Sequence, residues 1–153
     1  MPDMPGSPRF THLDDVGWQE VRRQQHGYHT ASVWEKWPEF DRYLTVYARY
    51  DPGMIVQPHG HNSDHVVFVM EGDIMCGERY CPAGTHIALD QGDTFGPFVA
   101  GPNGCVLFEI MMGDPRSFPA DQEAYQKFLA DQGVVPLPNP PIDMPQSLPD
   151  TRN

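Results

Sequence analysis

Apolar and polar residues alternate in the segment 43–50, which is the pattern of a half-buried β-strand. The segment 43–50 is rich in aromatic and β-branched residues, as strands are. The segment 65–70 has little polar content, which predicts a strand buried on both faces. Shorter strands are predicted at 54–58, 74–76, 79–81, 86–89 and 106–111, with Gly- and Pro-rich turns between them. Many short strands with such turns predict an all-β sandwich or barrel.

The N-terminal part of the chain does not follow this pattern. Residues 1–12 are rich in Pro and Gly and are expected to form a mobile arm. Residues 13–41 carry Trp18, Trp34 and Trp37, which favours a segment packed on the core, although one of these rings lining a pocket is the alternative. We therefore divide a single domain of 1–153 into an N-terminal arm and packing segment at 1–42 and a barrel at 43–113.

A helix and a proline-rich tail are predicted after the barrel. Ser117 resembles an N-cap, Pro119 suits a first helical turn and Gly133 suits the position after the last turn, so the helix is placed at 117–132. The tail, 133–153, is typical of extended polyproline-like chain. Its regularly spaced apolar residues predict that it lies along a surface.

Three histidines, His59, His61 and His65, follow one of the predicted strands. Residues two apart on a strand point to the same face, so His59 and His61 should project together. A turn at Asn62 and Ser63 would let His65 begin the next strand opposite them. Three converging imidazoles suit a divalent transition metal. The alternative is a cluster of surface histidines in a loop.

Composition narrows the class of protein further. The chain has 153 residues with a formal net charge of −11, which favours one domain and disfavours nucleic acid and anionic membranes as partners. No apolar run is long enough to span a membrane, and no secretory signal is evident. The odd number of cysteines, Cys76, Cys81 and Cys105, predicts free thiols and fits a reducing cytoplasm.

The histidine cluster resembles the first motif of the cupin superfamily, whose members are small metal-binding jelly-roll barrels. That motif has Gly, five residues, His-x-His, three or four residues, Glu, six residues and Gly. The chain matches every spacing from Gly53 to Gly72, but His65 stands where the family usually has Glu. The resemblance implies an all-β cupin-type jelly roll, to which the capping signals described above add one C-terminal helix.

The second cupin motif matches in spacing only. It runs Gly, five residues, Pro-x-Gly, two residues and His, and here it begins at Gly84, with Asp90 replacing the Pro and Phe95 replacing the metal-binding His. The resemblance implies a divalent metal bound by His59, His61 and His65. His86 could replace the lost fourth ligand or be an ordinary hydrogen-bonded strand histidine, and the sequence favours neither.

The remaining site predictions concern the walls of a pocket around the metal. Gln57 shares the strand face of His59 and is a candidate to bind a metal-bound water or a substrate oxygen, or else it is a polar rim residue. Apolar walls are predicted from Val67, Val69, Phe95 and Tyr47. A neutral ligand set would leave the metal charge uncompensated and favour a small, apolar substrate with an enolate or phenolate oxygen.

Three classes of function fit these predictions. The first is a non-haem Fe(II) dioxygenase, which the resemblance to all-histidine cupins favours. The second is a redox-neutral cyclase, isomerase or lyase that uses Zn, Ni or Mn. The third is a metabolite-binding cupin without catalysis. The fold decides among none of them. A homodimer, held partly by the N-terminal region or the tail, is expected because cupin barrels commonly pair.

Overall fold

The computed structural model describes residues 6–40, 43–144, 150 and 152. Its strands are β1 (Gln19–His26), β2 (His29–Glu39), β3 (Leu44–Tyr50), β4 (Ile55–Val56), β5 (His59–Cys76), β6 (Arg79–Pro82), β7 (His86–Leu89), β8 (Thr94–Phe95), β9 (Phe98–Pro119) and β10 (Val134–Pro136). A short 3-10 turn, η1 (Leu13–Asp15), precedes them, and one helix, α1 (Gln122–Gln132), separates β9 from β10. The predicted all-β class with one C-terminal helix is confirmed.

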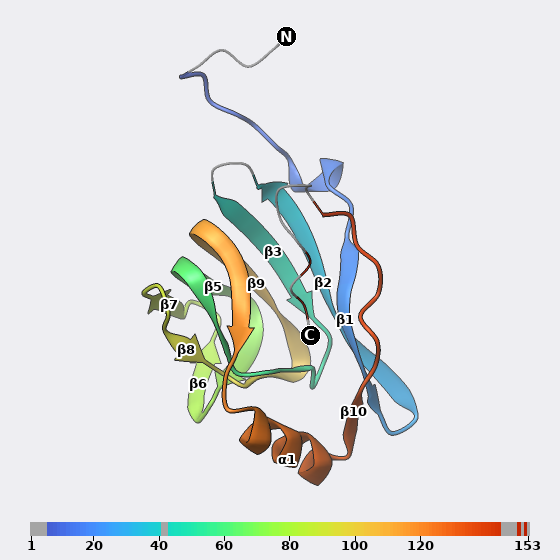
Figure 1. Cartoon of the computed structure of the whole chain (residues 1–153). Coiled ribbons are helices and arrows are strands. Elements are labelled where there is room, and N and C mark those ends of the chain that lie inside the picture. The colour runs from blue at the N-terminus through green and yellow to red at the C-terminus, as the bar shows by residue number, and fades with distance from the viewer. Residues whose placement is uncertain (1–5, 41–42, 145–149, 151, 153) are drawn as a thin grey trace.

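The strands form one curved sheet that closes around a core (Figure 1). Its order is β10-β1-β2-β3-β9-β5-β6, with β4 paired to β9 and both β7 and β8 paired to β5. All of these pairs are antiparallel. The long strands β5 and β9 pair along most of their length. This pairing fixes the position of β5 and of the histidines that it carries.

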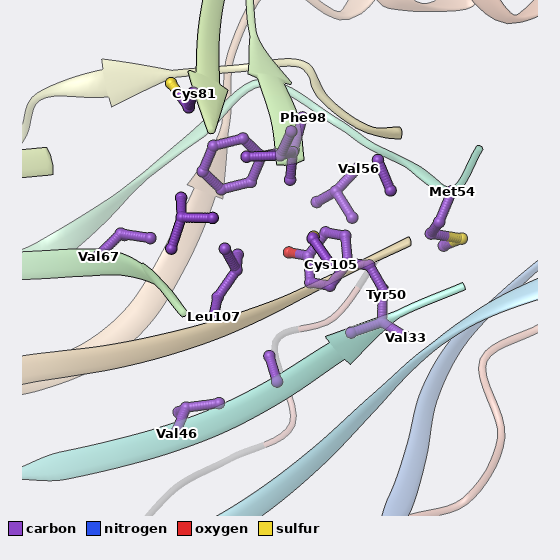
Figure 2. Close-up of a cluster of buried hydrophobic side chains, with 14 of the residues drawn as sticks. Val33, Val46, Tyr50, Met54, Val56, Val67, Cys81, Phe98, Cys105 and Leu107 are labelled. Carbon is purple, nitrogen blue, oxygen red and sulfur yellow. The ribbon is translucent and has the colours of Figure 1, made fainter. Parts of the chain in front are cut away.

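The core fills the space between the two sides of this sheet, with side chains that alternate inward along each strand (Figure 2). Ala48, Val67, Val69 and Leu107 have no exposed surface. Burial of such side chains contributes roughly 1.5–3 kcal/mol each for the larger ones. The three cysteines are unpaired, as predicted, and both Cys81 and Cys105 are buried.

Three predicted turns do not form. The expected reversal at 62–63 is wrong, because β5 runs unbroken from His59 to Cys76 with a shift of register between His61 and Ser63. The expected turn at 71–73 is likewise replaced by an irregular passage of the same strand, and the expected turn at 101–104 lies within β9. The register shifts near 71–73 and 101–104, as at β-bulges, whereas β5 passes through 62–63 with inward and outward residues alternating.

The N-terminal segment is part of the sheet. Residues 19–39 form β1 and β2, which pair with each other and with β3, so the barrel begins well before residue 43. The predicted packing segment therefore contributes two strands to the wall of the barrel and does not pack on its outside. Inward and outward residues alternate along β2, so Glu35 and Trp37 point into the barrel whereas Trp34 contacts the exposed Arg49.

The helix is shorter than predicted at its start. It begins at Gln122, because β9 continues to Pro119 and the cap residue is Asp121. It ends as predicted, with Gly133 in the left-handed conformation at φ 68°. Tyr125 and Leu129 bury its inner face beneath the barrel, on Ile55. Among the described residues, no helix is long and apolar enough to cross a membrane.

The C-terminal tail lies along its own β1, as the spacing of its apolar residues predicted (Figure 1). After the β10–β1 pairing, the amide of Leu137 donates to Arg23 O at 3.1 Å. The side-chain amide of Gln19 then donates to Asp143 O and accepts from Asp143 N. Residues 145–149, 151 and 153 of the tail lie outside the described residues, as do residues 1–5 of the predicted arm.

The homodimer remains a prediction. We expect light scattering to give twice the chain mass for the full-length protein, and a smaller mass for a chain that ends at Gly133. A monomeric mass for the full-length protein would contradict the dimer, and an unchanged dimer after truncation would exclude the tail from the interface.

Candidate functional site

A cavity of about 150 Å³ lies inside the barrel, between β1, β2 and β3 on one side and β5 and β9 on the other. A cavity of about this size is sufficient for a benzene-sized molecule. Its apolar wall includes Val21, Val33, Trp37, Leu44, Val46, Val56, Phe98, Met111, Ile142 and Met144. Its polar wall includes Arg22, Glu35, Tyr50, His59, His61, Glu109, Ser117 and Arg152.

The three predicted histidines come together on β5 beside this cavity. The ring centroids of His59 and His61 are 5.0 Å apart, and those of His61 and His65 are 4.8 Å apart. His61 and His65 have 9% and 2% of their surface exposed. Inward and outward residues alternate regularly along β5 from His61 to His65, so both of these histidines lie on the inner side of the sheet.

Each of these histidines has one ring nitrogen engaged with an oxygen atom. His59 Nδ1 lies 2.7 Å from Gln57 O, and His61 Nδ1 lies 2.8 Å from Pro115 O. A carbonyl oxygen only accepts, so each Nδ1 carries the proton and each Nε2 keeps a lone pair. His65 reverses the pattern, because its Nε2 lies 3.1 Å from Glu109 Oε1.

The other nitrogen of His65 has no partner. Its Nδ1 is fully buried and makes no hydrogen bond with any described residue. A buried polar atom without a partner is costly and calls for a ligand or an ion. Metal-ligating histidines commonly donate their second ring N–H to a carboxylate or a backbone carbonyl, which is the pattern at all three rings.

Burial keeps the first two imidazoles neutral at physiological pH. It lowers the pKa of His59 to about 4, although the hydrogen bond with Gln57 opposes the shift. Burial and the neighbouring His65 also lower the pKa of His61. Neutral imidazole is the form that binds metals.

Glu109, on β9, is the charged partner of this cluster. Burial raises its pKa, but the hydrogen bond from His65 and the nearby histidines outweigh that effect, so the pKa is lower than usual. An ionised Glu109 therefore places a negative charge beside the histidines. The expectation of an uncompensated metal charge is corrected accordingly.

The residues fit a divalent metal in their chemistry. Within the described part of the chain, no three His, Cys, Asp or Glu side chains converge as a preformed metal cage. Each of the three histidines nevertheless has one ring nitrogen next to an oxygen atom and the other free to bind a metal, as metal-ligating histidines do. In His65 the free nitrogen is the buried Nδ1. The residues that would hold a metal are His59, His61 and His65.

Phe95 packs on this cluster, but it is not among the residues that line the cavity. Its ring centroid lies 4.5 Å from that of His59 and 5.7 Å from that of His65. The position that the second cupin motif gives to a ligand is thus occupied by an apolar ring. Val67 and Val69 have no exposed surface and lie in the core rather than in the wall of the cavity.

His86 and Tyr47 do not join the cluster. His86 is exposed and pairs with Phe68, which places it on the opposite face of the sheet from His65 and Val67. The structure therefore does not support it as a fourth ligand. Tyr47 also lies on an outer face, with its ring centroid 6.1 Å from that of Trp18.

Gln57 lies beside the site but its side chain points elsewhere. Its Oε1 accepts a hydrogen bond from Gln122 Nε2 at 3.2 Å, near the start of α1. Its contribution to the site is the backbone carbonyl that holds His59. The expectation that its amide contacts a substrate is corrected, because the amide is committed to the helix.

The acidic residues of the cavity, Glu35 and Glu109 among them, were missed in the sequence. Glu109 occupies an inward position between Leu107 and Met111, so a charge in an otherwise apolar strand was the available signal. Glu35 follows Trp34 in a segment whose strands were not recognised, and no local signal distinguished it. Trp37, one of the rings considered for a pocket, does line the cavity.

Gly60 lets His59 and His61 share their strand. A Cβ atom there would lie 2.5 Å from Phe118 Cζ and 2.6 Å from Asp93 O. We expect Gly60→Ala to displace β5 between the two histidines and to cost about 1–3 kcal/mol of stability in thermal denaturation. The control is Gly17→Ala, where a Cβ meets nothing within 4 Å. Equal melting temperatures for the two variants would contradict this tight fit.

No protein-family model matches the sequence, and no curated protein matches it. Many solved structures do match the fold. A putative acetylacetone dioxygenase from Methylibium petroleiphilum PM1 has a TM-score of 0.62 at 11% identity, covering 80% of this chain and 88% of that chain. An RmlC-like cupin from Shewanella frigidimarina NCIMB 400 has a TM-score of 0.57 at 18% identity, covering 77% of this chain and 96% of that chain.

A sugar phosphate isomerase of the cupin superfamily, from Silicibacter pomeroyi DSS-3, is similar to the same extent. Its TM-score is 0.58 at 16% identity, and the match covers 74% of this chain and 82% of that chain. The chain therefore has the cupin fold, and the fold implied by the first motif is confirmed. These identities describe the fold and not the activity.

Proposed function

We propose that the chain is a metal-dependent enzyme that binds a small, enolisable molecule in the barrel cavity. The observation that carries this proposal is the shared pattern at His59, His61 and His65, each with one nitrogen held by an oxygen and the other available. A divalent metal bound there would act as a Lewis acid toward a substrate oxygen.

The cavity selects the size and the polarity of the substrate. Phe95, Phe98, Val46 and Met111 supply apolar surface near the histidines. His59 and His61 supply neutral donors, and the wall opposite carries Arg22. A β-diketone combines a flat apolar body with an oxygen that is readily made anionic. Acetylacetone is a suitable probe because it is small and belongs to this class.

Within this class we propose an Fe(II) dioxygenase. The fold shared with a putative acetylacetone dioxygenase and the all-histidine ligand set support this choice. The redox-neutral alternative, an isomerase or cyclase, is supported by Glu35, a second carboxyl in the cavity that suits proton transfer. Iron, zinc, nickel and manganese are all compatible with imidazole ligands.

Metal analysis tests the proposal first. Protein purified without a metal-affinity tag is expected to contain about one divalent metal per chain. Iron with acetylacetone-dependent oxygen uptake supports the dioxygenase, whereas metal with binding and no uptake supports the redox-neutral enzyme. Protein that binds no metal after incubation with Fe(II) or Zn(II) would overturn the proposal.

Calorimetry tests how the substrate is recognised. We expect acetylacetone to bind more tightly than its enol methyl ether, because methylation removes the anionic donor and keeps the apolar body. The expected difference is about tenfold or more, which corresponds to about 1.4 kcal/mol. Equal affinities would exclude recognition through an oxygen anion and would favour a cupin that only binds apolar molecules.

A further inference from the structure

Glu35 is a carboxyl inside the cavity that the metal-binding cluster does not use. It lies on β2 between Val33 and Trp37, and all three line the same cavity as His59 and His61. Its Oε2 accepts a hydrogen bond from Trp37 Nε1 at 3.4 Å. A carboxyl in such an apolar wall is costly, which favours a function for it.

The sheet register turns Glu35 toward the histidine side of the barrel. Glu35 pairs with Ala48 of β3, and Ala48 pairs with Leu107 of β9, two residues from Glu109 on the same inner face. Ala48 lies between β2 and β9 in this row of paired residues. Its side chain is only a methyl group, so it leaves space between Glu35 and Glu109. Glu35 and the histidines thus border one cavity from opposite walls.

The charged and titratable groups around Glu35 come from four segments. Glu109 of β9, Tyr50 of β3, Arg22 of β1 and Arg152 near the C-terminus all interact with it electrostatically. Burial, together with the negative charge of Glu109, raises the pKa of Glu35 to about 7, although the Trp37 hydrogen bond and both arginines oppose the shift. Both protonation states are therefore populated near neutral pH, as an acid–base catalyst requires.

We infer that Glu35 is a catalytic base that removes a carbon-bound proton from the substrate at the face opposite the histidines. The inference rests on the proposed function and assigns the proton transfer to a residue of this chain. It applies to the dioxygenase and to the redox-neutral enzyme alike, because each begins with the enolate of an enolisable carbonyl compound.

The step balances with acetylacetone as the substrate. The Glu35 carboxylate takes one proton from the carbon between the two carbonyls, so a C–H bond breaks and an O–H bond forms. The electron pair of the C–H bond becomes delocalised over the two carbonyl oxygens, which face the histidine wall. The reverse step returns a proton to carbon, and no oxidant or reductant is consumed.

Hydrogen–deuterium exchange measures this step without oxygen. We would follow loss of the methylene proton signal of acetylacetone by NMR in anaerobic D₂O buffer near neutral pD, with the metal-loaded full-length protein. We expect the wild-type protein to exceed the buffer background, and Glu35→Gln to lose at least about 100-fold of that excess. Glu35→Asp should retain part of it.

The control is a carboxyl on the same strand but outside the cavity. Glu39 pairs with Arg9 at 2.8 Å, and Glu39→Gln should exchange acetylacetone like the wild-type protein. Metal content and calorimetric binding of acetylacetone are measured on every variant. Both should be preserved in Glu35→Gln, because this side chain does not belong to the proposed ligand set.

The outcomes separate this inference from the proposed function. Normal metal content with wild-type exchange in Glu35→Gln would overturn the role of Glu35 and leave the metal enzyme intact. A wild-type protein that binds acetylacetone but does not accelerate exchange would also overturn it. Failure of the proposed function instead appears as wild-type protein that does not bind metal. The excess exchange should rise with pH as Glu35 ionises, and this rise should be absent in Glu35→Gln.

Discussion

Replacing His61 with Ala is expected to remove most of the bound divalent metal while the sheet stays folded. His61 is the middle ring of the cluster, with neighbours at 5.0 Å and 4.8 Å, so its loss breaks the group into two separate histidines. Loss of supporting residues alone commonly costs about 10–100-fold in metal affinity, and we expect at least that effect here. Metal analysis after dialysis measures it.

His86→Ala is the matched control for this variant. His86 lies on the same sheet but on its outer face, so the metal content should match that of the wild-type protein. The β-sheet circular dichroism of both variants should persist, because neither side chain is part of the hydrophobic core. Full metal occupancy in His61→Ala would refute the ligand assignment.

The histidine cluster could be predicted from the sequence because its spacing is local. Strand alternation places His59 and His61 together, and the cupin-like spacing adds His65. The route was still wrong, since β5 runs straight through residues 62–63, where a hairpin was predicted. Both geometries bring His65 to the same side, so the prediction of the cluster did not depend on which one formed.

The opposite wall of the site could not be predicted in the same way. Glu35 and Glu109 are 74 residues apart in the chain and approach only because β3 pairs with both β2 and β9. Strand pairing over such separations leaves no local pattern in a single sequence. His86 failed for a related reason, because the face of a short strand depends on a register that spacing alone does not fix.

Glu35→Gln is expected to stabilise the metal-free protein at alkaline pH. Burial and the charge of Glu109 raise the pKa of Glu35 from 4.5 to about 7, so the folded protein prefers the protonated carboxyl. This preference supports folding fully below the unfolded pKa and is lost as the pH rises from about 4.5 through 7. Above pH 7 the wild-type protein must hold an ionised carboxylate in an apolar wall, whereas the Gln variant has no charge to bury.

Thermal denaturation at pH 5 and pH 8 measures this effect. The full shift corresponds to about 3 kcal/mol, and because the cavity admits solvent to Glu35 we expect about 1–2 kcal/mol. The melting temperature of Glu35→Gln should therefore exceed that of the wild-type protein by about 2–8 °C more at pH 8 than at pH 5.

The control is Glu39→Gln, which removes an outer carboxyl paired with Arg9. Its melting temperature should differ from that of the wild-type protein by the same amount at both pH values. If the effect of Glu35→Gln on the melting temperature did not depend on pH, ionisation of Glu35 would cost the folded protein nothing. The raised pKa of Glu35 would then be wrong. Proteins commonly lose some stability at residues that serve catalysis. A loss of stability that appears only when Glu35 is ionised fits its proposed role as a base.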